Sequence, residues 1–509
     1  MQDAVRQKAR KRPFLPPEFV RAMLAGHSAL GIAFAALIYV VCISGTLAVF
    51  LHELYRWEQP DAPVVTQPLT PDAVAAAVSG AYEKALAAGA VHDIFVLGPN
   101  PVQKRVIVHF HDHESGVEGD WLADETGTLV APSHTPWSEF VANLHMHLHL
   151  PRTWGLFLVG LTGVALLSSL ISGLLSHPRL FKDAFALRRG GARRLEQADL
   201  HNRLGVWGLP FHVVVSTTGA LLGLSTLVVG VLALAAYDGD SEKAFATILG
   251  PMASEDETAA PLPDVANMIR QVQARHPDAV FASVTIQHIA KAGQVVHVGM
   301  RTPGHLAMAN TYYFDGTGRW LGDGGLETGS IGKQILGALQ PLHFGWFGGF
   351  AVKIGYGLLG LAMTVVTATG ITIWLARRRA AGRPAPRWEN VWSGVMWGQP
   401  FAIAAVAVAV LLTDAASIAV STYLVVTVVA IAGALALPDA FAAGRLLRAV
   451  SGVALLAMIG LHARAWGVQP ADPVATAVNI AMGASAAMLI GSALVPWRRA
   501  RMRVSANGL

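Results

Sequence analysis

The sequence is poor in cysteine and in charge. Cys42 is the only cysteine among 509 residues, and Asp, Glu, Lys and Arg together make up 14% of the chain. No disulfide can therefore form within the chain, and a structural zinc site with four nitrogen and sulfur ligands is disfavoured. Hydrophobic residues, by contrast, make up 53%, and the mean hydropathy is +0.46. This composition excludes an ordinary soluble domain and indicates a polytopic α-helical membrane protein.

Apolar segments of the length that crosses a bilayer, about 20 residues, occur about eight times. Four of them are separated by long polar segments, and four more follow closely as an accessory bundle. We predict the first four spans at 28–51, 154–176, 204–236 and 344–375, and the bundle over 398–497, with spans near 398–413, 415–437, 449–463 and 474–496.

Lys and Arg are concentrated on one side of these spans. In an eight-span arrangement, 24 of the 38 basic residues fall on the same side, in segments 1–27, 177–203, 376–397, 438–448 and 498–509. The positive-inside rule makes that side cytoplasmic, so both termini are predicted to lie inside the cell. The net charge of +5 is thus a signal of topology, and nothing in the sequence suggests binding to nucleic acid.

Two long segments, 52–153 and 237–343, lie on the other side and are acidic, with 13 acidic against 5 basic residues in the first and 11 against 7 in the second. An acidic exterior suits a cationic or neutral substrate. Each segment has the pattern of a small α+β domain. We expect helices over 71–88 and 264–275, and strands over 92–97, 104–111, 279–288 and 294–300.

The first four spans and the two outer segments look like one unit used twice. Residues 27–31 (HSALG) match residues 201–205 (HNRLG), and Gly45 corresponds to Gly219 at equal spacing. The second and fourth spans share a Ser/Thr-Gly pair at 172–173 and 369–370. We predict an internal pseudo-repeat whose halves are related by an axis along the membrane normal, with a cofactor near that axis.

Histidines gather at the ends of the first four spans: His27, His145, His149, His177, His201, His212 and His343. Ionisable groups near a bilayer are costly and usually functional, and neutral imidazole is a common ligand of haem iron. Helical spacing places His145 and His149 on one face, and His201 and His212 on nearly one face three turns apart. Facing histidines at both membrane surfaces would suit electron transfer. For each single residue, an interfacial hydrogen bond to a headgroup is the competing interpretation, and it is favoured for His177.

Other polar residues are weaker candidates. Arg21, Arg203, Arg152 and Lys353 lie near these histidines and are candidates for binding haem propionates, with solvent or lipid phosphate as alternative partners. His109, His111 and His113 alternate along a predicted strand and therefore share a face. They are weak candidates for a surface metal site, and a simple polar strand face is the preferred interpretation.

The sequence motifs around these histidines resemble the PepSY-associated transmembrane family of iron-regulated membrane proteins, over about residues 20–380. The matching motifs are His27-x-x-Leu30-Gly31, 144–155, 201–212 and 342–349. The resemblance implies a bacterial inner-membrane protein with periplasmic PepSY-like domains at 52–153 and 237–343. Characterised relatives are siderophore reductases that hold b haems through histidine pairs. The seven histidines above match positions of that family pattern.

The resulting hypothesis is a ferric-siderophore reductase with two haem b groups. His27 and His201 would hold the inner haem, with His212 as a substitute ligand, and His343 would hold the outer haem with His149 or His145. The cofactor carries the chemistry, so no catalytic side chain is needed. Electrons would pass from a separate donor (a flavoprotein, NAD(P)H-linked protein or quinol) to a periplasmic ferric chelate. A non-enzymatic PepSY regulatory or assembly protein, and a quinol- or copper-linked b-type cytochrome, remain alternatives.

Overall fold

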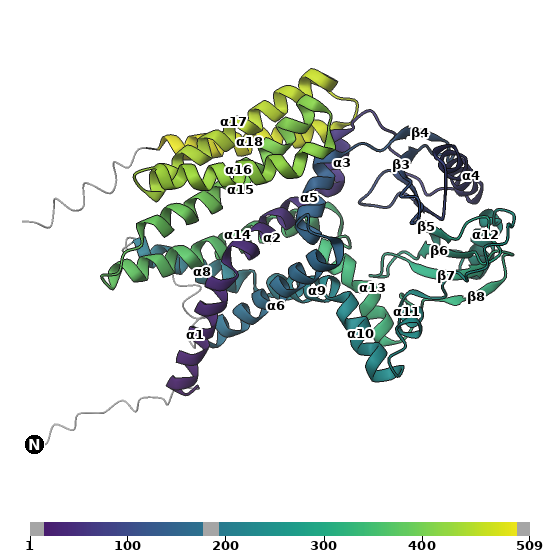
Figure 1. The fold of residues 1–509 in the computed structure, drawn as a ribbon, viewed down its shortest axis with the longest axis horizontal. Helices are drawn as coiled ribbons and strands as arrows, with labels where there is room; N and C mark the ends of the chain where they lie inside the picture. The colour runs from purple at the N-terminus through teal and green to yellow at the C-terminus, as the bar shows by residue number, and fades with distance from the viewer. Residues whose placement is uncertain (1–14, 177–192, 496–509) are drawn as a thin grey trace, which may run out of the picture.

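The computed structural model describes residues 15–176 and 193–495, so the predicted candidate His177 lies outside the described residues. Within these ranges the chain is predominantly helical, and a single β-sheet domain lies at one end of the helical region (Figure 1).

Six helices in the described ranges are long and apolar enough to cross a membrane: α6 (Arg152–Ser176), α14 (Gly349–Ala380), α15 (Pro386–Thr413), α16 (Ala419–Ala436, preceded by the turn η1, Ala416–Ile418), α17 (Ala440–Trp466) and α18 (Pro473–Leu494). Two bent pairs bring the number of spans to as many as eight. They are α1 (Pro17–Ala33) with α2 (Ala35–Ala48), and α8 (Arg193–Trp207) with α9 (Leu209–Gly223). The prediction of a polytopic membrane protein is confirmed.

Each bent pair turns by 70° at its break. In the second pair the break falls at Gly208, two residues before Pro210. Proline has no N–H, and its ring would collide with the carbonyl of Val206 in a continuous helix. His201 and His212 therefore do not lie on one face of a single helix, and that prediction is wrong. The chain breaks again before α10 (Ser225–Ala236), which divides the predicted span 204–236.

The outer segments together form one antiparallel sheet of eight strands, in the order β4-β3-β2-β1-β5-β6-β7-β8. The first segment contributes four strands, the second contributes four, and the two halves meet where β1 pairs with β5. The strands are β1 (Asp93–Leu97), β2 (Val106–His111), β3 (Glu118–Ala123), β4 (Leu129–Pro132), β5 (Val280–Gln287), β6 (Val295–Arg301), β7 (Asn310–Asp315) and β8 (Trp320–Asp323).

Two helices, α4 (Pro71–Ala88) and α12 (Val265–Arg275), pack together with the sheet around one apolar core. Arg270 of α12 also forms an ion pair with Asp72 of α4. The helices predicted over 71–88 and 264–275 are confirmed, as are strands at the four predicted positions. The sequence predicted two separate α+β domains, whereas the structure joins them through main-chain hydrogen bonds and a shared core.

Short helices connect the sheet to the spans: α3 (Leu51–Glu58), α5 (Pro136–His147), α11 (Ser241–Leu249) and α13 (Ile331–Phe344). The accessory bundle α15–α18 docks on α3. Arg56 Nε lies 2.6 Å from Asp472 Oδ2, and His462 Nε2 donates to the Trp57 carbonyl at 2.7 Å. The ring of His462 also stacks on that of Trp57. His462 therefore has a structural role in the docking of the bundle.

Glu58 is buried at the end of α3 and fixes the start of α5. Its carboxylate accepts hydrogen bonds from Trp137 N at 2.8 Å, Ser138 N at 2.9 Å and Ser138 Oγ at 2.8 Å. Burial raises the pKa of Glu58 to about 7, although the three hydrogen bonds favour the ionised form and oppose the shift.

Since the folded-state pKa of Glu58 exceeds its ordinary value, the stability linked to its protonation is lost as the pH rises through about 7. We expect this group to reduce the free energy of unfolding by about 1 kcal/mol between pH 6 and pH 8. Thermal unfolding in detergent across this range checks the effect. Glu58→Gln, which does not titrate, should flatten the fall, and Glu125→Gln at an exposed position should not. An equal slope in all three proteins would contradict the prediction.

Candidate functional site: two cavities with paired histidines

Two adjacent cavities lie among the first helices, and each is lined by two histidines. The cavity containing His27 and His201, here called the basic-side cavity, has a volume of about 260 Å³. The cavity containing His145 and His343, here called the sheet-side cavity, has a volume of about 230 Å³. Ile38 lines both. The two cavities are therefore separated by little more than a layer of apolar side chains.

In the basic-side cavity the imidazoles come from α1 and α8. The ring centroids of His27 and His201 are 6.2 Å apart, with an angle of 76° between the ring planes. Nδ1 of His27 donates to the carbonyl of Ser169 on α6 at 2.8 Å. Nδ1 of His201 lies 2.9 Å from the carbonyl of Val366 and 3.1 Å from Oγ1 of Thr369, both on α14.

The sheet-side cavity repeats this arrangement with α5 and α13. The ring centroids of His145 and His343 are 6.1 Å apart, with an angle of 20° between planes. Nδ1 of His145 donates to the carbonyl of Val41 on α2 at 3.0 Å. Nδ1 of His343 lies 3.0 Å from Oγ1 of Thr218 on α9. Because that hydroxyl already donates to the carbonyl of Val214, it accepts from the imidazole.

A hydrogen bond at Nδ1 fixes the tautomer and orientation of an imidazole and makes Nε2 the nitrogen that is presented to a metal. A metal lies about 2 Å from each ligating imidazole nitrogen. Adding about 1 Å from each nitrogen to its ring centre, two imidazoles on opposite sides of one metal atom have centroids about 6 Å apart. Both histidine pairs have this separation.

Each of these histidines also lies against a glycine on a neighbouring helix. A Cβ at Gly45 would stand 2.6 Å from Cε1 of His145, and one at Gly219 would stand 2.9 Å from Cε1 of His343. Cβ atoms at Gly173 and Gly370 would stand 3.2 and 3.6 Å from His27 and His201. The glycines therefore make room for the imidazoles, most tightly in the sheet-side cavity.

The contacts made by the first bent pair, α1–α2, and by α6 recur in the second bent pair, α8–α9, and in α14. Within the bent pairs, and within the spans that follow them, the corresponding positions have a constant sequence offset. The offset is 174 residues in the first bent pair of helices and 197 residues in the following span. The corresponding positions are His27 and His201, Gly45 and Gly219, Ser169 and Val366, and Gly173 and Gly370. Each half thus supplies one histidine to each cavity.

Two of the other predicted histidines, His149 and His212, do not line either cavity. Helix α5 ends at His147, and Leu148 and His149 adopt left-handed φ values of 57° and 54°. His149 therefore does not share a helical face with His145, contrary to the prediction. Its Nε2 donates to the carbonyl of Phe140 at 3.0 Å. His212 is fully buried near Gly208 and Leu359, and neither ring nitrogen makes a hydrogen bond of ordinary geometry within the described ranges.

Among the described residues, none of the four predicted propionate partners lines a cavity. Arg21 and Arg152 are exposed, and Arg203 lies 3.9 Å from Asp199. Lys353 is buried and forms an ion pair with Glu53, with Nζ and Oε2 2.5 Å apart.

Arg377, one of the basic residues of segment 376–397, does line the basic-side cavity. It follows Gly370 by seven residues on α14, which is two helical turns on the same face. That spacing is the signal that would have identified it.

The three alternating histidines of the sheet make separate contacts. His109 Nδ1 lies 2.9 Å from Asp120 Oδ1, and this hydrogen bond raises the pKa of His109. His111 and His113 contact each other, with 2.9 Å between their Nε2 atoms. These three do not form a common ligand set. Within the described ranges, His92 instead groups with Glu257 and His288, which are distant in sequence, and a second group joins His92 to Asp93 and His113.

Comparison with known proteins places these features in a family. A family model described as the PepSY-associated TM region matches residues 24–377, which include all four cavity histidines. The chain is also 30% identical over 390 residues to an uncharacterised protein of Pseudomonas aeruginosa, covering 72% of this chain and 96% of that relative.

The glycine contacts predict a graded effect of added methyl groups. Gly45→Ala should destabilise most, by about 1–3 kcal/mol through overpacking against His145, followed by Gly219→Ala, Gly173→Ala and Gly370→Ala. Gly26→Ala, on α1 with open space around its Cβ, is the matched control and should be neutral or stabilising by up to about 1 kcal/mol. Thermal unfolding in detergent measures the series. A loss at Gly26 equal to that at Gly45 would show that the imidazole contact is not the cause.

Proposed function

Because the chain belongs to the PepSY-associated transmembrane family, we propose that it holds one haem b in each cavity and conducts electrons across a bacterial inner membrane to a ferric chelate. The observation that carries this proposal is the pair of facing imidazoles in each cavity, at centroid separations of 6.2 and 6.1 Å and with Nδ1 hydrogen-bonded in all four.

The donor set of the cavities fits haem better than a bare metal ion. Each lining contains two histidines and, among the described residues, no carboxylate and no third histidine. A structural zinc ion requires four protein ligands. A porphyrin brings four of its own nitrogens, so two imidazoles complete the coordination of its iron. The mostly apolar linings also suit a flat, hydrophobic macrocycle.

When bound, the haems supply one-electron redox chemistry. The residues of the chain would hold each haem in place and disfavour its reaction with dioxygen. His27 and His201 would hold one haem and His145 and His343 the other, and two imidazole ligands per haem would favour electron transfer over oxygen chemistry. The hydrogen bonds at Nδ1 keep each imidazole in one orientation. Arg377, which lines the basic-side cavity, is the proposed partner of a propionate in place of the four sequence candidates.

We further infer that the two halves form a pseudo-repeat around an axis through the cavities, as the constant offsets of the histidine and glycine positions suggest. The positive-inside rule orients the chain in the membrane with the basic segments in the cytoplasm and both termini inside the cell. The eight-stranded sheet is then a pair of joined PepSY-like domains in the periplasm. The sheet-side cavity is the outer redox site, and the basic-side cavity is the inner one.

The proposed substrate is a ferric siderophore or another ferric chelate in the periplasm. One electron reduces the chelated Fe(III) to Fe(II), which is bound more weakly and is released. The electron comes from a separate donor, a cytoplasmic flavoprotein, an NAD(P)H-linked protein or a membrane quinol. The Gly-x-Gly-x-x-Gly match in the sequence, residues 355–360, lies within helix α14 and does not follow a strand, so it is not a dinucleotide signature. The acidic outer segments accord with a neutral or cationic chelate.

The haem proposal predicts how much haem the purified protein contains, which the pyridine haemochromogen assay measures. Wild type should bind two haem b per chain, and His27→Ala, His201→Ala, His145→Ala and His343→Ala should each reduce this to about one. His149→Ala is the matched control and should retain two, because His149 lies outside both cavities.

Two outcomes would overturn the assignment. A colourless wild-type protein would favour a regulatory or assembly protein without redox activity. Retention of two haems in His145→Ala together with loss in His149→Ala would show that the assignment of the outer histidine pair is wrong.

The substrate proposal is tested with reduced protein in liposomes, which should reduce ferric siderophores to Fe(II) that a chromogenic chelator traps. Selective reduction of Cu(II) or quinone would favour the linked-cytochrome alternative.

A further inference from the structure

A separate cluster of potential ligands lies at the seam where the two halves of the sheet meet. His92 directly precedes β1 and His288 directly follows β5, and the antiparallel pairing of Ile94 with Ile286 sets these residues opposite each other. Their ring centroids are 4.0 Å apart. Ile289 N donates to the carbonyl of His92 at 3.0 Å, which fixes the main chains of the two halves at this point.

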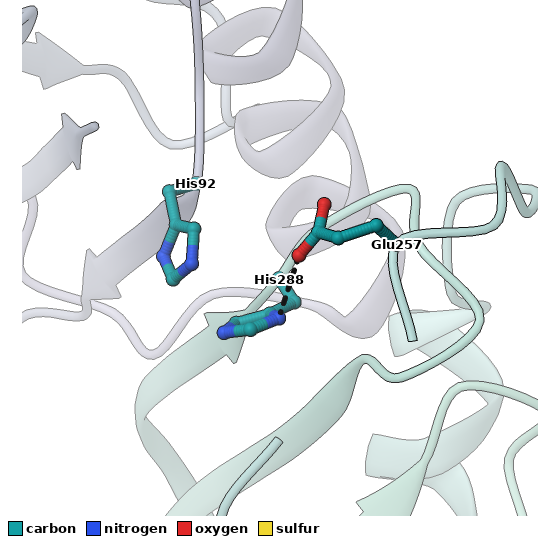
Figure 2. Close-up of side chains that lie close together, drawn as sticks. All are labelled: His92, Glu257 and His288. Atoms are coloured by element: carbon teal, nitrogen blue, oxygen red, sulfur yellow. Dashed lines mark ion pairs between the residues drawn. The ribbon is translucent and has the colours of Figure 1, made fainter. Parts of the chain in front are cut away.

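Glu257 approaches the same point from the segment that precedes α12. That segment is attached to the residues after His288, where Ala292 N donates to the carbonyl of Thr258 at 2.7 Å. His92, Glu257 and His288 each offer one ligand atom, and these atoms lie within 4.8 Å of one another. Figure 2 shows the three side chains converging, with His92 on the ribbon of the first half and the other two on that of the second.

We propose that His92, Glu257 and His288 bind a divalent transition-metal ion that bridges the two halves of the sheet. Two imidazoles and one carboxylate favour borderline ions such as Zn²⁺, Cu²⁺, Ni²⁺ or Fe²⁺ over Ca²⁺ and Mg²⁺, which prefer oxygen ligands. Three protein ligands leave positions open for water or for a ligand carried by the ion. This site is independent of the haem proposal.

The hydrogen bonds around the cluster prepare two of its ligands. His92 Nδ1 lies 2.8 Å from Oδ1 of buried Asp93, which also accepts from His288 N at 3.1 Å. This carboxylate–histidine contact leaves Nε2 of His92 to bind the metal. Oε2 of Glu257 pairs with Lys291 Nζ at 3.0 Å, and Oε1 remains on the side of His288.

His288 supplies an independent indication of a ligand. Its buried Nδ1 lies 3.3 Å from Glu257 Oε1 but makes no hydrogen bond of ordinary geometry within the described ranges. A buried polar atom without a hydrogen bond costs about 1–3 kcal/mol, and a metal ion would offset that cost. The residue also has φ of 52°, a left-handed conformation that is unfavourable for a side chain with a Cβ. Such strain is typical of functional positions.

A neighbouring group, His92 with Asp93 and His113, shares one histidine with this set. Its remaining members already have partners. Oδ1 of Asp93 accepts from His92 and His288, and His113 contacts His111. The geometry therefore points to Glu257 and His288, rather than Asp93 and His113, as the ligands that join His92.

Isothermal titration of Zn²⁺ into the full-length, detergent-purified protein without a polyhistidine tag tests the site. Wild type should bind one Zn²⁺ with an affinity that His288→Ala and Glu257→Gln each weaken at least about tenfold. His305→Ala, an exposed histidine elsewhere in the sheet domain, and His113→Ala should match wild type. Zinc should also raise the thermal unfolding temperature of wild type more than that of His288→Ala.

Equal affinities in wild type, His288→Ala and Glu257→Gln would overturn the proposal, and so would a loss seen only in His113→Ala. Haem content is measured on the same samples and should not change in any of these variants. A failure of this site is thereby distinguishable from a failure of the proposed electron-transfer function. The thermal unfolding transition of each metal-free sample shows whether that variant is folded.

Discussion

The hydrogen bond from Nδ1 of each cavity histidine to a neighbouring helix is the interaction on which the arrangement of the first four spans depends. In the apolar interior of a membrane protein, polar groups must find partners within the protein. The four bonds link α1 to α6, α8 to α14, α5 to α2 and α13 to α9. Each bond satisfies one polar nitrogen of an imidazole that would otherwise be costly to bury and fixes the orientation of the ring.

The bends in α1–α2 and α8–α9 explain how one span serves both cavities. The first arm of each pair carries the basic-side histidine, His27 or His201. The second arm carries the hydrogen-bond acceptor and the glycine that receive the sheet-side histidine, such as Val41 and Gly45 for His145. In a straight helix, the histidine of the first arm and the acceptor and glycine of the second arm would all lie along a single helix axis. With a 70° break between the arms, the first arms α1 and α8 pack against α6 and α14, respectively. The second arms α2 and α9 contact α5 and α13, and they also pack against α14 and α6.

The histidines of the site could be predicted from the sequence because ionisable groups at the ends of apolar helices are rare and costly. The strands and helices of the outer segments were also evident from periodicity. The pairing of His343 could not be predicted, because it depends on where α5 ends. Leu148 and His149 adopt left-handed backbone conformations that turn His149 away from His145, and no sequence rule favours that conformation for leucine.

The bend before Pro210 follows from proline chemistry, and it separates His201 from His212, which helical spacing alone would place on one face. Lys353 was judged by its proximity in sequence, whereas its ion pair with Glu53 depends on the packing of α14 beside α3. The seam between the halves lay beyond sequence reasoning for a similar reason. His92 and His288 become neighbours only through the pairing of β1 with β5, which no local pattern encodes.

No described residue of the accessory bundle lines either cavity. All four cavity histidines and their acceptors lie within the matched region 24–377, and the Pseudomonas relative is covered almost completely by 72% of this chain. The bundle contacts α5, which carries His145, and α2, which accepts the hydrogen bond of His145. Tyr39 on α2 donates to the carbonyl of Met396 at 2.6 Å, and Trp137 on α5 donates to that of Ile403 at 3.1 Å. Both contacts brace helices beside His145, and Trp392 of the bundle also donates to the carbonyl of Ala368 on α14 at 3.1 Å, so the bundle packs against helices of both bent-pair units.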